Sequence, residues 1–150
     1  MAPNGALILF PFLEKTSYLN SPMTKEIILI DGIKNNPSTF HHVVKANGFL
    51  FLSSQLSCDL KTGAILTGNV QRQTRRALDN VKFLIEACGG QMEDIVKVVI
   101  YMRDAQLRNE INSVYSEYFK SGTEPAKVSV QAPSSVPGID VEVEVTAVAR

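Results

Sequence analysis

The sequence contains few cysteines, and its charges balance. Cys58 and Cys88 are the two cysteines in 150 residues, and their spacing matches no zinc-binding pattern. Two cysteines are too few for a disulfide scaffold, so we expect reduced thiols in a cytoplasmic protein. Fifteen basic and fifteen acidic side chains give a formal net charge of zero, so no overall field favours nucleic acid or an anionic membrane. Any ligand must therefore be bound by a local site.

Motifs for cofactors and metals are also missing. The chain has no G-x-G-x-x-G, no Walker loop, no H-E-x-x-H and no cysteine cluster, so we expect neither a nucleotide cofactor nor a metal. The two histidines, His41 and His42, are adjacent on an expected strand and therefore point to opposite faces, which argues against a local pair of ligands. No basic stretch is interleaved with aromatic residues, so a nucleic-acid platform is not supported.

The apolar run near the N-terminus is short. GALILFPFL has nine residues, which is too few to span a bilayer, and it lacks the basic region and small-residue cleavage site of a secretory signal. We therefore expect residues 1–22 to be an extension outside the core, with a mobile tail favoured over an ordered arm on a neighbour. Residues 23–150 have the size and composition of a single domain.

The first half of that domain has strong strand patterns. Residues 25–32 and 41–56 are rich in Ile, Val, Leu and Phe, and the second stretch is divided by Asn47-Gly48. Asn-Gly is the strongest short signal for a two-residue hairpin turn, because both residues accept a positive φ. We therefore expect three strands between residues 26 and 56.

Helices and strands alternate in the second half. Asn69 is expected to cap a helix, which Gly89-Gly90 ends after Cys88. A strand over 94–102, a helix from about Ala105 to Lys120 and strands over 126–132 and 140–148 follow. The order βββαβαββ predicts an α+β fold, with two helices packed on one sheet. The second helix is expected to bury a stripe formed by Leu107, Ile111, Val114 and Tyr118.

Two late strands carry polar side chains on one face each. Lys127, Ser129 and Gln131 alternate on the first, and Glu142 and Glu144 alternate on the second. If these strands pair, they bring a cation and carboxylates together. The alternative is a solvated polar face, which is common on a sheet that is covered by helices on one side.

Several segments resemble one known family. They are SSQLSCDLKTG, NVQRQTRRALDNVKFLIEACG, DIVKVVIYMRD, NSVYSEYF, EPAKVSVQAP and VEVEVTAVA, which follow one another over residues 26–150. Together they identify the chain as similar to the Rid family, also known as YjgF/YER057c/UK114. The residues before Met23 have no counterpart in that family.

The resemblance implies a chorismate-mutase-like fold and a homotrimer. In such a barrel-like assembly the sheets pack around the trimer axis, the helices lie outside, and the ligand sites lie between subunits. The implied activity is hydrolysis of 2-imino or 2-enamino acids to 2-oxo acids and ammonia, without a cofactor. The implied partners are small 2-imino or 2-oxo carboxylic acids, and the charge balance argues against a membrane or a nucleic acid as partner.

Site residues also follow from the resemblance. Lys127 takes the place of the arginine that binds the substrate carboxylate, and Glu142 takes that of the glutamate that positions the attacking water. Lysine is a compact, strongly hydrated cation without the planar fork of arginine, so the resemblance implies weaker control of substrate orientation. The remaining implied binding residues are Phe40, Ser53, Ser54, Asn112 and Ser129, with Gln55 completing the Ser53-Ser54-Gln55 segment.

Three functions stay open on the sequence. The first is an imine deaminase, slowed or shifted in substrate, in which Lys127 and Glu142 act as the catalytic pair. The second is a non-catalytic trimer that binds small carboxylates or regulates a partner. The third is an endoribonuclease or translation inhibitor, which the neutral charge and the lack of a histidine pair make the weakest of the three.

Overall fold

The computed structural model describes residues 24–35 and 39–150. The expected extension, residues 1–22, lies outside the described residues. The elements follow the predicted order βββαβαββ, which confirms the α+β class. Two short 3₁₀ helices, η1 and η2, are added. The elements are β1 (Glu26–Ile28), β2 (Val43–Ala46), β3 (Phe49–Gln55), α1 (Val70–Ala87), η1 (Met92–Asp94), β4 (Ile95–Met102), η2 (Ala105–Leu107), α2 (Arg108–Tyr115), β5 (Ala126–Gln131) and β6 (Val141–Val148).

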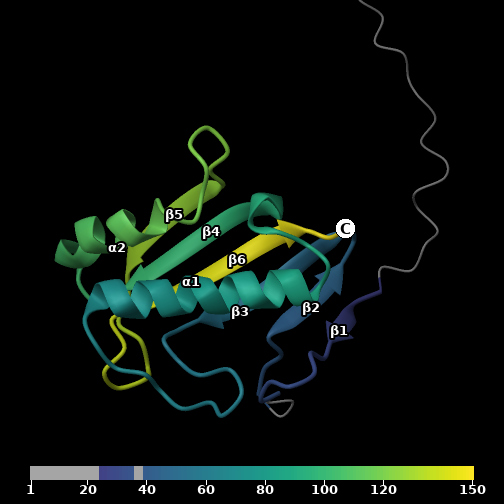
Figure 1. The fold of residues 1–150 in the computed structure, drawn as a ribbon, viewed down its shortest axis with the longest axis horizontal. Coiled ribbons are helices and arrows are strands. Elements are labelled where there is room, and N and C mark those ends of the chain that lie inside the picture. Colours follow the sequence, from purple (N-terminus) through teal and green to yellow (C-terminus); the bar gives the residue numbers. More distant parts are fainter. Residues whose placement is uncertain (1–23, 36–38) are drawn as a thin grey trace, which may run out of the picture.

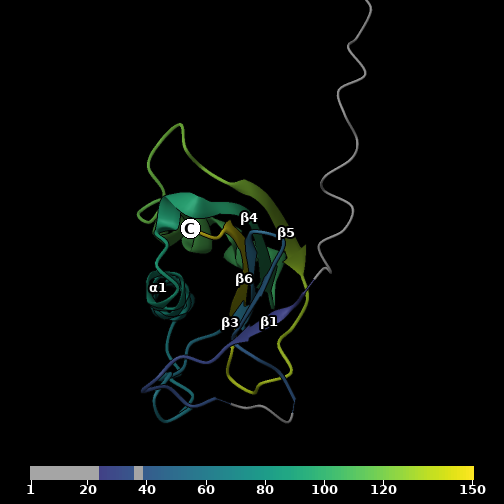
Figure 2. The ribbon, with the colours of Figure 1, turned by 90° about the vertical axis from the view of Figure 1, so that its right-hand side faces the viewer.

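The strands form one six-stranded sheet in the order β1-β2-β3-β6-β4-β5. Only β4 and β5 run parallel among the described pairs, and the other neighbours are antiparallel. α1 lies along one side of this sheet (Figures 1 and 2). β4 separates β5 from β6, so the two strands with alternating polar residues are not neighbours. The predicted meeting of Lys127 with Glu142 and Glu144 required these two strands to pair. Within one chain they do not pair.

The predicted hairpin joins β2 to β3. Asn47 has φ 49° and Gly48 has φ 78°, which is the pair of positive values that a two-residue turn of this kind requires. Val43 pairs with Leu52 and Lys45 with Leu50. This register puts Val43, Leu50 and Leu52 on the buried face of the sheet. β1 takes up only the first part of the apolar stretch 25–32, since it ends at Ile28, and the chain turns at Gly32, which has φ 78°.

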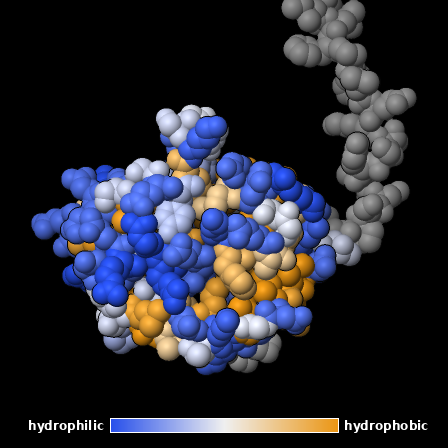
Figure 3. Space-filling view, in the orientation of Figure 1, coloured by the Kyte–Doolittle hydropathy of each residue, from blue (hydrophilic) through white to orange (hydrophobic). Residues whose placement is uncertain are grey.

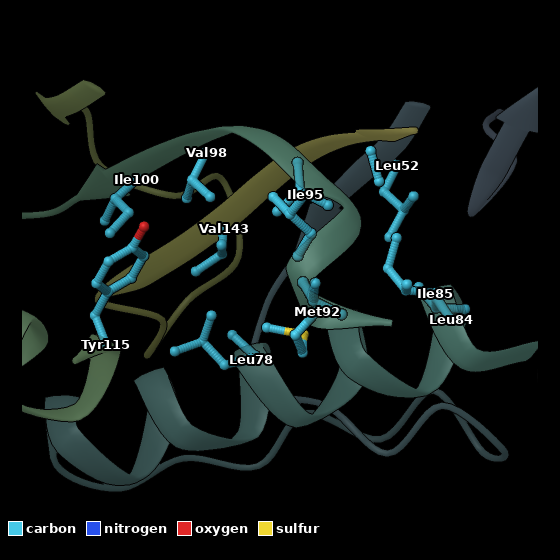
Figure 4. Packing of buried hydrophobic residues seen from close by; sticks show 14 of the residues in the cluster. Leu52, Leu78, Leu84, Ile85, Met92, Ile95, Val98, Ile100, Tyr115 and Val143 are labelled. Atoms are coloured by element: carbon cyan, nitrogen blue, oxygen red, sulfur yellow. The ribbon is translucent and has the colours of Figure 1, made fainter. Parts of the chain in front are cut away.

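Packing of α1 on the sheet forms most of the core. Asn69 caps the helix, as predicted, with its side chain accepting a hydrogen bond from the backbone N–H of Arg72. Figure 4 shows Leu78 of α1 beneath Val143 of β6 and Val98 of β4. All three side chains are fully buried, so this contact contributes through apolar area removed from water.

The second helix is shorter than the sequence predicts. α-Helical structure begins at Arg108 and ends at Tyr115, where we expected a helix from Ala105 to Lys120. Ser113 and Ser116 donate their hydroxyls to the backbone carbonyls of Glu110 and Ser113, and such local bonds compete with regular helix geometry. The buried stripe also differs. Tyr115 and Phe119 are buried beside Ile111 and Val114, whereas Leu107 and Tyr118 are only partly buried.

The two faces of the sheet differ in their cover. Figure 3 shows the face that carries α1, where hydrophilic side chains dominate over the helices and apolar ones gather toward β1 and β2. The opposite face, which we call the open face, presents exposed hydrophobic side chains from four strands, β1, β3, β5 and β6. They are Ile27, Phe49, Phe51, Val128, Val130 and Val148. No helix within residues 24–35 and 39–150 is long and apolar enough to cross a membrane.

Candidate active site

Glu142 lies on the open face, held by two hydroxyl groups. Its carboxylate accepts hydrogen bonds from the Oγ of Ser54 at 2.6 Å and of Ser134 at 2.5 Å. Ser54 belongs to β3, at a register irregularity between Leu52 and Gln55 that redirects the strand against β6. Ser134 belongs to the loop between β5 and β6. Two different segments therefore fix the position of this carboxylate.

A second carboxylate, Glu144, lies two residues along the same strand. It accepts a hydrogen bond from the Oη of Tyr101 at 2.7 Å. This bond, together with burial and the charges of both glutamates, raises the pKa of the Tyr101 phenol, so Tyr101 stays a donor at neutral pH. From the sequence, Glu144 was expected on the same polar face as Glu142 but had no place in the site, and Tyr101 had no assigned role. Alternation along 141–148 gave the position of Glu144, but nothing local indicated that Tyr101 of β4 would face it.

Both glutamates line one hollow of about 590 Å³ on the open face. Four residues that the resemblance assigned to the site meet here, because the start of β2 and the end of β3 lie beside the start of β6. The lining includes Phe40, Ser53, Ser54 and Glu142, together with His41 and Glu144. Ser53 is tied to the residues just before β2, since its Oγ donates to the carbonyl of His41 at 2.8 Å.

Lys127 lies on β5, at the edge of the sheet, and faces the helices. It is paired in register with Val98, which is fully buried beneath α1. The Lys127 Nζ donates to Asn112 Oδ1 at 2.6 Å and lies 4.1 Å from the centre of the Tyr115 ring. Burial and the positive charge of Arg108 lower the pKa of the Lys127 ammonium below its ordinary value. The two groups that contact the ammonium, the Asn112 amide and the Tyr115 ring, are both neutral.

Within one chain, the side chains of Lys127 and Glu142 therefore lie on opposite faces of the sheet. β4 lies between their two strands and gives the reference: Lys127 is aligned with buried Val98, whereas Glu142 is aligned with Tyr101, which points to the open face. Ser129 shares the helix side with Lys127, because it is aligned with buried Ile100. The assigned residues form two groups. The helix-side group is Asn112, Lys127 and Ser129, and the open-face group is Phe40, Ser53, Ser54 and Glu142.

Gln131 and the histidines have other positions. Gln131 accepts a hydrogen bond from the backbone N–H of Ala105 at 3.1 Å, which ties the end of β5 to η2. His41 lines the open-face hollow, whereas His42 is buried with Nε2 3.1 Å from the carbonyl of Lys34. In the part of the chain that the structure describes, no three His, Cys, Asp or Glu side chains are grouped so that they could hold a metal ion.

Comparison with known sequences gives matches over most of the chain. The profile of the family described as Endoribonuclease L-PSP matches residues 34–149. A RutC family protein of Pyrococcus horikoshii, PH0854, is 37% identical over 125 residues, which cover 83% of this chain and 97% of that protein. A RutC family protein of Saccharolobus solfataricus, SSO3206, is 34% identical over 126 residues, covering 84% of this chain and 98% of that one.

Solved structures give the same result for the fold. The crystal structure of a protein of unknown function from Yersinia pestis, YyfA of the conserved Rid protein family, superposes with a TM-score of 0.77 at 26% identity, covering 84% of this chain and 100% of that chain. The structure of Escherichia coli TdcF with bound serine superposes with a TM-score of 0.73 at 28% identity, covering 83% of this chain and 99% of that chain.

Proposed function

Since the chain belongs to the Rid family of Endoribonuclease L-PSP and RutC proteins, we propose that it hydrolyses 2-imino or 2-enamino acids to 2-oxo acids and ammonia. The observation that carries this proposal is the carboxylate of Glu142, which two hydroxyls hold in an open hollow. A fixed carboxylate can orient a water molecule toward an electrophilic carbon. The reaction consumes water alone and needs no cofactor.

We further propose that the active protein is a homotrimer with its sites between subunits. The open face supports association, because it exposes Phe51, Val128 and Val130 at 46%, 41% and 37% of their full areas. β5 supports it too, since an edge strand is available to a second chain. In this assembly the Lys127 edge of one subunit meets the Glu142 hollow of the next. The unpaired thiols Cys58 and Cys88 fit a reducing compartment, the cytoplasm.

Each group in the proposed site has one task. The ammonium of Lys127, positioned by Asn112, binds the substrate carboxylate, and Ser129 lies on the same side of the strand. Glu142 accepts a proton from water as the oxygen bonds to C2 of the protonated imine. The nitrogen of the resulting carbinolamine takes the proton held by Glu142, the C–N bond breaks so that ammonia leaves, and the hydroxyl proton is released to solvent as the 2-oxo acid forms. Ser54 and Ser134 hold the carboxylate in place throughout.

The experiment is an imine-hydrolysis assay, with the substrate generated by an amino-acid oxidase. Wild-type protein should accelerate 2-oxo acid formation, and Glu142→Gln should slow the enzymatic rate by roughly 10²-fold or more, because the amide cannot accept the proton. Glu144→Gln is the matched variant, since it lies on the same strand and in the same hollow. We expect it to retain most of the activity.

Two results would change this assignment. Loss of activity in Glu144→Gln, with Glu142→Gln active, would move the water-positioning role to Glu144 and leave the deaminase proposal standing. If wild-type protein gives no acceleration over a protein-free control with any imine tried, the deaminase proposal is wrong.

A second candidate is a non-catalytic trimer that binds small carboxylic acids or regulates a partner. It is favoured by the presence of Lys127, which holds a carboxylate without a bidentate fork and so controls the substrate plane poorly. The relative TdcF was crystallised with bound serine, which is consistent with recognition of small carboxylates. This function predicts thermal stabilisation by 2-oxo acids without turnover, and a screen in which none of them raises the Tm would count against it.

The third alternative is RNA cleavage, as the description of the family profile suggests. His41 and His42 do not form an acid–base pair, because one lines the hollow and the other is buried against Lys34. RNA cleavage that follows the trimer through chromatography, and is lost in Glu142→Gln or Lys127→Ala, would put this function first.

A further inference from the structure

A second cavity lies beside the carboxylate hollow. It has a volume of about 290 Å³ and is bounded by the loop after β3 and the segment before β2. Its apolar lining residues are Phe40, Leu56, Leu60, Ile65 and Val136. We call it the apolar cavity.

The apolar cavity adjoins the hollow that contains Glu142 and Glu144. Phe40, Ser54, Leu56 and Val136 line both. Ser54 therefore lies at the boundary, with its hydroxyl donated to Glu142 on the side of the hollow. A molecule whose reacting carbon lies near Glu142 can extend a side chain past Ser54 into the apolar cavity.

Several polar residues around the apolar cavity already have partners. His42 Nε2 is bonded to the Lys34 carbonyl, and Gln55 Nε2 donates to the Ser53 carbonyl at 2.9 Å. The Asp59 carboxylate accepts from the backbone N–H groups of Lys61 and Thr62. Burial raises the pKa of the Cys58 thiol, so this group stays neutral. These bonds leave mainly apolar surface to contact a ligand, and such surface favours hydrocarbon over a polar group.

We infer that the apolar cavity binds the side chain of the substrate, and that the preferred substrates are 2-imino acids with long or branched apolar side chains, such as those derived from leucine and methionine. The inference rests on the proposed imine hydrolysis and names its substrate class. The size is sufficient, since an apolar protein cavity of roughly 150 Å³ holds a benzene molecule. Imines derived from alanine or serine would leave the apolar cavity unfilled.

The test compares kcat/KM for imines generated by amino-acid oxidases from leucine and from alanine. Wild-type protein should prefer the leucine-derived imine by about 10-fold or more, the discrimination expected when an apolar pocket is filled instead of left empty. Equal kcat/KM values, or a preference for the alanine-derived imine, would overturn the inference.

Two tryptophan variants test whether the apolar cavity causes the preference for the leucine-derived imine. Ile65→Trp should fill the apolar cavity and lower kcat/KM more for the leucine-derived imine than for the alanine-derived one, which removes the preference. Leu66→Trp is the matched control, because Leu66 belongs to the same loop and lines a different depression, beside Arg72 and Arg76. Both positions tolerate a larger side chain, since Ile65 and Leu66 are 41% and 37% exposed. An unchanged preference in Ile65→Trp would contradict the role of the apolar cavity.

Binding separates this inference from the proposed function. If no imine is hydrolysed, the proposed function fails. The role of the apolar cavity is then tested by binding alone, by comparing the rise in Tm with the 2-oxo acid derived from leucine and the rise with pyruvate. A larger rise with the leucine-derived acid, lost in Ile65→Trp and kept in Leu66→Trp, supports it. Equal rises, or none, overturn it.

Discussion

At the scale of single residues, Lys127 is the position on which the proposed chemistry depends most. Its ammonium has a neutral acceptor in Asn112 and an aromatic face in Tyr115, and the positive charge of Arg108 acts against it. Burial raises the pKa of the Tyr115 phenol to about 12, so that ring stays neutral beneath the ammonium. A bound carboxylate would supply the counter-charge that these contacts do not.

Lys127→Arg tests how well the ammonium orients a substrate. If lysine weakens an otherwise competent site, the planar guanidinium should raise kcat/KM for imine hydrolysis on the order of tenfold to a hundredfold, by restoring bidentate binding. The measurement is the oxidase-coupled assay on both proteins, and Lys127→Ala is the control that removes the cation. An unchanged or lower rate in Lys127→Arg would indicate a site reshaped for another use, which favours the non-catalytic binder.

Carboxylate binding should depend on pH through Lys127. The folded-state pKa of this ammonium is lowered, so the positive charge is present at low pH and is lost as pH rises through a value below that of an ordinary lysine. Affinity for a 2-oxo acid should therefore fall on the alkaline side, earlier than in Lys127→Arg, whose guanidinium stays charged. Titration calorimetry between neutral and alkaline pH measures this, and identical alkaline profiles for the two proteins would contradict it.

At the scale of elements, Gln73 connects α1 to the loop that carries Ser134. Its side chain is 1% exposed and makes three hydrogen bonds to backbone groups. The amide nitrogen donates to the carbonyls of Gly68 and Gly138, and the amide oxygen accepts from the N–H of Asp140. The loop between β5 and β6 is thus fixed to the start of the helix, and with it one of the two hydroxyls that hold Glu142.

Gln73→Leu should affect both stability and the site. Removing the buried amide breaks three part-buried hydrogen bonds to backbone groups, so we expect the free energy of unfolding to fall by about 2 kcal/mol or more. We also expect slower imine hydrolysis, because Ser134 loses its support. Urea denaturation and the coupled assay measure the two effects. Gln71→Leu, on the exposed side of the same helix, is the control, and equal stability of the two variants would contradict the prediction.

At the scale of the whole molecule, the sheet has one face covered by helices and one exposed apolar face. Exposed hydrophobic residues on four strands form an apolar surface of the kind that marks an interaction site, and one of them, Phe51, lines the hollow that holds both glutamates. Association through the open face would bury this area and enclose the hollow. Substrate access and self-association are therefore expected to depend on the same surface.

Phe51→Glu should prevent assembly by placing a charge on the open face. We expect wild-type protein to sediment as a trimer and the variant to sediment as a smaller species, because a buried unpaired carboxylate is costly. Phe83→Glu is the matched control, since Phe83 is equally exposed, at 44% against 46%, but lies on α1. A monomeric wild-type protein, or a trimeric Phe51→Glu, would contradict the proposed assembly.

Local sequence determined the elements and their order. Period-two and three-to-four-residue patterns, the Asn47-Gly48 turn and the Asn69 cap are short-range features, so they predict strands, the hairpin and α1 without knowledge of the fold. The end of α2 was mispredicted, because serine side chains that bond to nearby carbonyls compete with the helix after Tyr115.

Tertiary structure alone decided which of the polar residues meet. Insertion of β4 between β5 and β6 puts Lys127 against the helices and Glu142 on the open face, and it brings Tyr101 to Glu144. Alternation assigns a residue to one of two faces of its own strand, but strand order and register determine which face is shared with another strand. The sequence therefore determined which side chains are available for chemistry, and the long-range pairing of the strands determined where each of them lies.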